Sequence, residues 1–205
     1  MGSKIGLAGA EGCESLAESG GLENRYTRKG IGSSNLPPSA TTVGGGPMAT
    51  QDALREDVLW LLSGGRAHVG FQRAVADLPE ALRGKKPRGT PYTPWQLLDH
   101  MRVCQWDILE YIRDPDHVSP EWPEGYWPEA VPARGAWDKS VRAFQADLRA
   151  LKALVSDPST NLLAKVPYDP DGPTILHEVL LVADHNAYHL GQLIVLRRML
   201  GAWKD

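Results

Sequence analysis

Two histidines near the C-terminal end, His185 and His189, have the clearest potential for chemistry. Residues four apart on an α-helix project from the same face about one turn, roughly 6 Å, from each other, so both imidazoles can approach one metal ion. A third ligand would come from another helix, and His100 lies in an apolar segment that places it near the inward face of a bundle. Three imidazoles leave a coordination position open to water or substrate, as in catalytic sites. The same spacing also occurs in surface pairs and in hydrogen-bonded core pairs, so this alternative stays open.

Three polar side chains share the helix faces of these histidines. Cys104 is four residues after His100 and is either a fourth ligand or a small buried core residue. Asp107, seven residues after His100, is a candidate to orient a water or accept a ligand proton, the alternative being a solvated or helix-pairing carboxylate. Gln192, three residues after His189, is a comparable candidate to support the site.

The other histidines and the neighbours of the pair fit other roles. His177 is two helical turns, about 12 Å, before His185 and is too far away to share its metal. His68 and His117 have no partner at a useful spacing. Asp184 and Tyr188 point away from the pair on a helix, so we expect them to pack or to lie at an interface.

Apolar residues at helical spacing predict four long helices that position these side chains. Gly64-Gly65 weakens the middle of the first helix, and no segment shows a convincing strand pattern. We therefore expect an all-α four-helix bundle. The helical segments are Gln51–Leu78, Trp95–Arg113 after the N-cap Thr93 and Pro94, Trp137–Val155 before Asp157-Pro158, and a run from the N-cap Thr174 to about Leu200, closed by Gly201.

The proline-rich segment 115–132 should have little regular structure but much apolar surface to hide. Its aromatic residues Trp122, Tyr126 and Trp127 are candidates to line and cap a pocket over an open metal position and to contact an apolar substrate. Alternatively, they cover the end of the bundle.

Residues 1–48 differ in composition from the rest of the chain. They are rich in Gly, Ser and Pro, and all seven Trp residues lie after Met48. Such a segment buries too little apolar surface to offset the entropy of ordering it. We expect a flexible, disordered leader over 1–48 and a bundle domain over 49–205, with Met48 as the native initiator.

Length and charge exclude several classes of protein. The chain has 205 residues and a net charge of -3, so a basic nucleic-acid-binding protein is not expected. No stretch approaches the roughly 18 apolar residues of a membrane helix, and we expect neither a membrane span nor a signal peptide. The two cysteines, Cys13 and Cys104, cannot make a disulfide framework, which favours the reducing cytoplasm.

Three motifs resemble the DinB and YfiT-like proteins, a family of four-helix bundles described as metal-dependent enzymes. The resemblance covers most of residues 49–203. It implies an up-down-down-up bundle, a frequent tendency to form homodimers, and a divalent metal bound by His100, His185 and His189. The motifs are Trp95-Gln96-Leu97-Leu98-Asp99-His100, Gly125-Tyr126-Trp127-Pro128 and Ala183-Asp184-His185-Asn186-Ala187-Tyr188-His189-Leu190-Gly191-Gln192.

Family relatives include thiol-dependent transferases and isomerases as well as hydrolases. The resemblance therefore implies a metal-dependent transferase or hydrolase that acts on a small-molecule substrate, with a low-molecular-weight thiol as a possible cofactor. Imidazole ligands suit zinc, nickel and iron alike, so the metal stays open. The alternative is a non-catalytic helical binding or assembly module whose metal is structural or absent.

Overall fold

The computed structural model describes residues 47–64 and 67–204, and every regular element in this part of the chain is a helix. The all-α prediction is confirmed. The only β pairing among these residues is an isolated bridge between Lys165 and Thr174. No helix of the described part is long and apolar enough to cross a membrane. The helices are α1 (Pro47–Ser63), α2 (Phe71–Val75), α3 (Glu80–Arg83), α4 (Pro94–Arg113), α5 (Ala136–Ser156) and α6 (Ile175–Met199).

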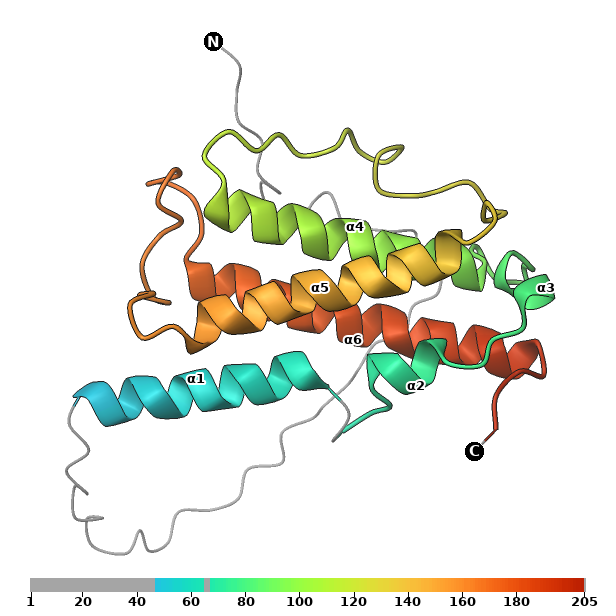
Figure 1. Ribbon diagram of the computed structural model, residues 1–205, viewed down its shortest axis with the longest axis horizontal. Coiled ribbons are helices and arrows are strands. Elements are labelled where there is room, and N and C mark those ends of the chain that lie inside the picture. Colours follow the sequence, from blue (N-terminus) through green and yellow to red (C-terminus); the bar gives the residue numbers. More distant parts are fainter. Residues whose placement is uncertain (1–46, 65–66, 205) are drawn as a thin grey trace, which may run out of the picture.

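The four long helices, α1, α4, α5 and α6, lie side by side along the molecule (Figure 1). Helix α4 packs against both α5 and α6, and α1 packs against α5 and α6. Helices α1 and α6 run in one direction and α4 and α5 in the other (Figure 1). Because α4 and α6 are antiparallel neighbours, the middle of α4 faces the middle of α6, where the candidate metal ligands lie. The expected leader lies outside the described residues, except for Pro47 and Met48, which belong to α1.

The prediction of one helix over Gln51–Leu78 is wrong beyond Ser63. Helix α1 ends there, and Gly64 adopts a left-handed conformation with φ of 60°. This conformation is typical of the residue that follows a helix, and glycine adopts it without a steric penalty. The short α2 follows, and its end is stabilised by Arg197 of α6, whose guanidinium donates to the carbonyl of Ala74 at 2.6 Å.

The helices that carry the histidines begin at the predicted caps. The Thr93 hydroxyl accepts from the backbone N–H of Gln96 at 3.2 Å, and the Gln96 side chain accepts from the backbone N–H of Thr93 at 3.1 Å. This reciprocal capping box satisfies two helix-end donors of α4. Thr174 caps α6 by accepting from the backbone N–H of His177 at 3.1 Å. The predicted starts and ends of α4, α5 and α6 agree with the structure to within a residue or two.

Two apolar clusters flank a layer of polar residues between α4 and α6. One cluster joins apolar residues of the range 95–101 on α4 to those of 190–196 on α6. The other cluster joins apolar residues of 108–112 on α4 to those of 175–183 on α6. The buried polar residues between the clusters therefore depend on apolar packing on both sides for their position. They include His100, Gln105, Asp107, Asn186 and His189.

Residues 115–132, which we call the strap, pass alongside α4 without forming a helix or strand (Figure 1). Side chains near the start of α4 hold the strap by donating to three successive carbonyls. Trp95 Nε1 donates to Glu129 at 3.0 Å, and Gln96 Nε2 donates to Pro128 at 3.2 Å. The Thr93 hydroxyl donates to Ala130 at 3.2 Å. The prediction that this segment has little regular structure is confirmed.

Two buried acidic residues, Asp107 of α4 and Glu178 of α6, lie in the α4–α6 interface, each two helical turns from a histidine of the same helix. Glu178 is only 2% exposed, and its Oε2 accepts no hydrogen bond from the described residues. Burial and the nearby carboxylate of Asp107 raise the pKa of Glu178 from 4.5 to about 7. The folded chain therefore holds this proton more tightly than the unfolded chain. The resulting contribution to stability is complete below pH 4.5 and is lost as the pH rises through 7.

Replacing Glu178 with Gln should remove this pH dependence. We expect the free energy of unfolding of Glu178→Gln, relative to the wild type, to rise by about 3 kcal/mol between pH 4.5 and about pH 8.5. Urea denaturation of both proteins at these two pH values measures the difference. Glu80→Gln, at an exposed position of α3, serves as the control and should show no such rise. A constant difference between Glu178→Gln and the wild type would contradict the expectation.

Candidate metal centre

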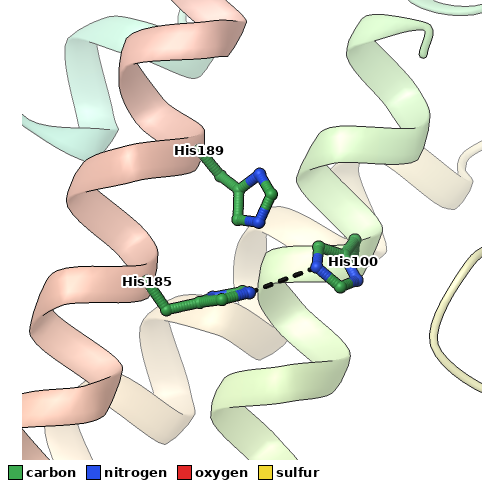
Figure 2. Close-up of side chains that lie close together, drawn as sticks. All are labelled: His100, His185 and His189. Carbon is green, nitrogen blue, oxygen red and sulfur yellow. Dashed lines mark hydrogen bonds between the residues drawn. The ribbon is translucent and has the colours of Figure 1, made fainter. Parts of the chain in front are cut away.

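Three histidine rings meet between α4 and α6 (Figure 2). One ligand nitrogen from each of His100, His185 and His189 lies within 4.8 Å of the other two. The Nε2 atoms of His100 and His185 are 3.1 Å apart. His100 is 1% exposed and His189 is 4% exposed, whereas His185 is half-buried. The structure thus brings together all three histidines that the sequence and the family resemblance singled out.

Hydrogen bonds at Nδ1 hold two of the rings with Nε2 unprotonated. The Nδ1–H of His100 donates to the backbone carbonyl of Tyr126 at 3.2 Å. The Nδ1–H of His189 donates to Oε1 of Gln192 at 2.8 Å. A neutral imidazole carries one proton, so in both rings Nε2 is left as the acceptor or metal-binding atom. Such outer partners are common behind metal-ligating histidines, because they fix the tautomer and the ring orientation.

The donor set fits a divalent transition metal. With metal–nitrogen distances of about 2.0–2.1 Å, two ligands of a tetrahedral zinc ion lie about 3.3 Å apart. The 3.1 Å separation between the nitrogens of His100 and His185 is close to this value. Two lone pairs cannot face each other at this distance without a shared proton or a cation between them. The site therefore suits zinc, nickel or iron with three imidazole ligands.

The buried position keeps two of these imidazoles neutral. Burial lowers the pKa of His100 to about 2, with smaller effects from His185 and His189. Burial, followed by the effect of His185, lowers the pKa of His189 to about 4. Both rings are therefore unprotonated at neutral pH, as metal ligation requires. The unfolded chain takes up protons near pH 6.5 that the folded chain does not, so these histidines cost stability as the pH falls below that value.

Aromatic rings from the strap, from Tyr92 before α4 and from Tyr188 of α6 surround the histidine cluster. The Trp127 ring stacks on His100 with centroids 3.7 Å apart and planes 7° from parallel. Tyr92 stacks in turn on Trp127 at 4.1 Å. Trp122 approaches His100 edge-on at 6.5 Å, and Tyr188 approaches His189 at 4.9 Å. The strap therefore forms an apolar wall of the site, and Tyr92 is a contributor that the sequence did not suggest.

The other candidate residues lie around the site in different ways. Cys104 is buried, and its Sγ lies 3.6 Å and 3.7 Å from the two ring nitrogens of His100, but it does not join the group of three ligands. Gln192 contacts a ligand directly, as described above. Asp107 is 1% exposed and bonds to the strap through Tyr126 and His117, each at 2.7 Å.

His117 has no partner at a useful spacing along the sequence, yet the structure gives it one. Its Nε2 lies 2.7 Å from Oδ1 of Asp107, and its ring meets Trp106 edge-on at 5.2 Å. No fixed spacing signals this contact, because His117 lies in the strap and the path of the strap determines which residue it meets. His68 and His177 are exposed and lie outside the cluster, as expected.

Comparison with known proteins agrees with this geometry. The family model of the DinB superfamily matches residues 66–193, a range that holds all three clustered histidines and the whole strap. No curated protein and no solved structure matches the chain. The matched range covers more than half of the chain, from the residues before α2 to the end of the polar layer on α6. The chain belongs to the DinB superfamily.

Proposed function

We propose that this protein is a divalent-metal-dependent enzyme, a thiol-dependent transferase or a hydrolase, whose metal is held by His100, His185 and His189. The observation that carries the proposal is the convergence of three imidazoles whose ligand nitrogens all lie within 4.8 Å. Their origin on two different helices means that the site depends on the folded bundle.

The number of ligands favours a catalytic role over a structural one. Structural zinc sites are closed by four protein ligands, whereas catalytic sites use three and keep one position open. Among the described residues, no fourth His, Cys, Asp or Glu joins the group. His185 is the most exposed of the three, so the side of His185 is where a small substrate would approach.

The residues of the chain hold and enclose the reacting position. Tyr126 and Gln192 keep Nε2 of His100 and His189 free of protons, and Trp127 shields one face of His100 from water. When bound, a divalent metal would lower the pKa of a water or of a low-molecular-weight thiol at its open position. The aromatic wall suits a substrate or thiol with apolar surface. We include in the proposal a small-molecule substrate and a homodimer, as the family resemblance implies.

Elemental analysis of untagged protein tests the metal site. We expect about one equivalent of zinc, nickel or iron in the wild type and loss of the metal in His100→Ala and His185→Ala. His177→Ala, an exposed histidine of the same helix α6, is the matched control and should retain the metal. If the wild type binds no metal even after reconstitution with each of the three ions, the protein is a helical module without a metal centre.

A cobalt-loaded form tests the open position. Cobalt in a three-histidine site gives visible absorption bands that change when an added ligand enters its coordination shell. We expect a small thiol to shift these bands, with modest loss of thermal stability on chelation, because the bundle is preformed. Unchanged bands together with a large drop in melting temperature on chelation would identify a structural metal.

Replacing Gln192 with Ala tests the support behind His189. Loss of the acceptor for Nδ1–H should weaken zinc affinity by roughly 10- to 100-fold, because the ring is no longer held in one tautomer. Competition with a chromogenic chelator measures the affinity. Gln145→Ala is the control, since the amide of Gln145 bonds to Gln72 and contacts no histidine of the site. Equal affinity in the two variants would show that the Gln192 contact does not support the ligand.

A further inference from the structure

Asp107 joins helix α4 to the strap. Its carboxylate is 1% exposed, and both oxygens bond to strap residues. The Tyr126 hydroxyl donates to Oδ2 at 2.7 Å, and His117 Nε2 lies 2.7 Å from Oδ1. A buried carboxylate without donors is costly, because it loses its hydration. The strap supplies these donors, so its position against α4 is tied to the burial of Asp107.

The same strap residue that bonds to Asp107 also holds His100. The carbonyl of Tyr126 accepts from Nδ1–H of His100 at 3.2 Å. The next residue, Trp127, stacks on the His100 ring at 3.7 Å. The carbonyl fixes the ring in its plane and selects its tautomer, whereas the stacked indole fixes its tilt. Both restraints on His100 therefore come from two adjacent residues of the strap.

Residues 126 and 127 are held from two sides. Towards the start of α4, side chains of Thr93, Trp95 and Gln96 bond to the carbonyls of residues 128–130. Two turns beyond His100 on α4, Asp107 bonds to Tyr126 and His117. Between these anchors, the Tyr126 ring packs with Val103 and Cys104, and the backbone N–H groups of residues 126 and 127 donate to the carbonyl of Pro123. Asp107 is the α4 residue that bonds to the Tyr126 side chain itself.

We propose that Asp107 is a positioning residue for the metal centre, which acts through Tyr126 to hold His100 in the tautomer and orientation that bind metal. Asp107 bonds to none of the three histidines of the cluster. Its effect reaches His100 through the phenol and then the backbone carbonyl of a single residue. The part of the inference that concerns metal affinity rests on the proposed function, whereas the part that concerns the tautomer of His100 does not.

Two substitutions that each remove a tyrosine hydroxyl distinguish this role from general stabilisation of the fold. Tyr126→Phe removes the hydroxyl that bonds to Asp107 and keeps the ring and the carbonyl. Tyr111→Phe is the matched control, since the Tyr111 hydroxyl donates to the carboxylate of Asp169 at 2.8 Å and not to the strap or the cluster. Zinc affinity is measured by chelator competition, thermal stability by melting, and the His100 tautomer by long-range proton–nitrogen NMR of the metal-free protein.

We expect both variants to lose similar thermal stability, but only Tyr126→Phe to bind zinc about tenfold more weakly. In the metal-free protein, only Tyr126→Phe should lose part of the Nδ1–H tautomer of His100. His117→Gln, which alters the other strap contact of Asp107 and leaves Tyr126 in place, should shift affinity in the same direction. If Tyr126→Phe fails to fold, His117→Gln provides the test in its place.

Equal zinc affinity and an unchanged His100 tautomer in Tyr126→Phe and Tyr111→Phe would overturn the positioning role. If the wild type binds none of zinc, nickel and iron, the proposed function fails, and the tautomer measurement by itself decides the role of Asp107. A shifted tautomer supports that role, and an unshifted one overturns it.

Discussion

Burying an imidazole between two helices requires a partner for each of its ring nitrogens, and the arrangement around His100 follows from this requirement. The ring is 1% exposed, so water does not provide the partners. The strap provides one through the carbonyl of Tyr126, and helix α6 provides the other through Nε2 of His185. The strap must therefore follow α4 closely, and α6 must place its pair of histidines opposite the middle of α4.

The polar layer between α4 and α6 depends on the apolar clusters on either side of it. His100 and His189 are held neutral by burial, and Glu178 is buried with one oxygen lacking a donor among the described residues. Each of these groups costs stability at some pH. The leucine, valine and aromatic contacts of the two clusters offset that cost. Two of these groups, His100 and His189, thus lie where chemistry is proposed to occur, and Glu178 lies two helical turns away in the same interface.

Much of the site was predictable because its geometry is helical. The spacing of His185 and His189 places both rings on one face of α6, and the caps at Thr93 and Thr174 set where α4 and α6 begin. The first helix was predicted too long, because its apolar periodicity continues past Gly64, where the backbone turns left-handed. Periodicity reports which residues prefer to be buried, and a single glycine can end a helix without disturbing that pattern.

The sequence by itself determined helices α4, α5 and α6, their apolar faces and the pair of histidines, because these follow from the repeat of the α-helix over a few residues. Only the tertiary structure decided that His117 meets Asp107, that Tyr126 holds His100, and that Trp127 stacks upon it. These contacts lie on the strap, which has no repeat of its own. Its path is set by hydrogen bonds from side chains of α4 to its carbonyls, and such bonds join residues whose separation along the chain carries no periodic signal.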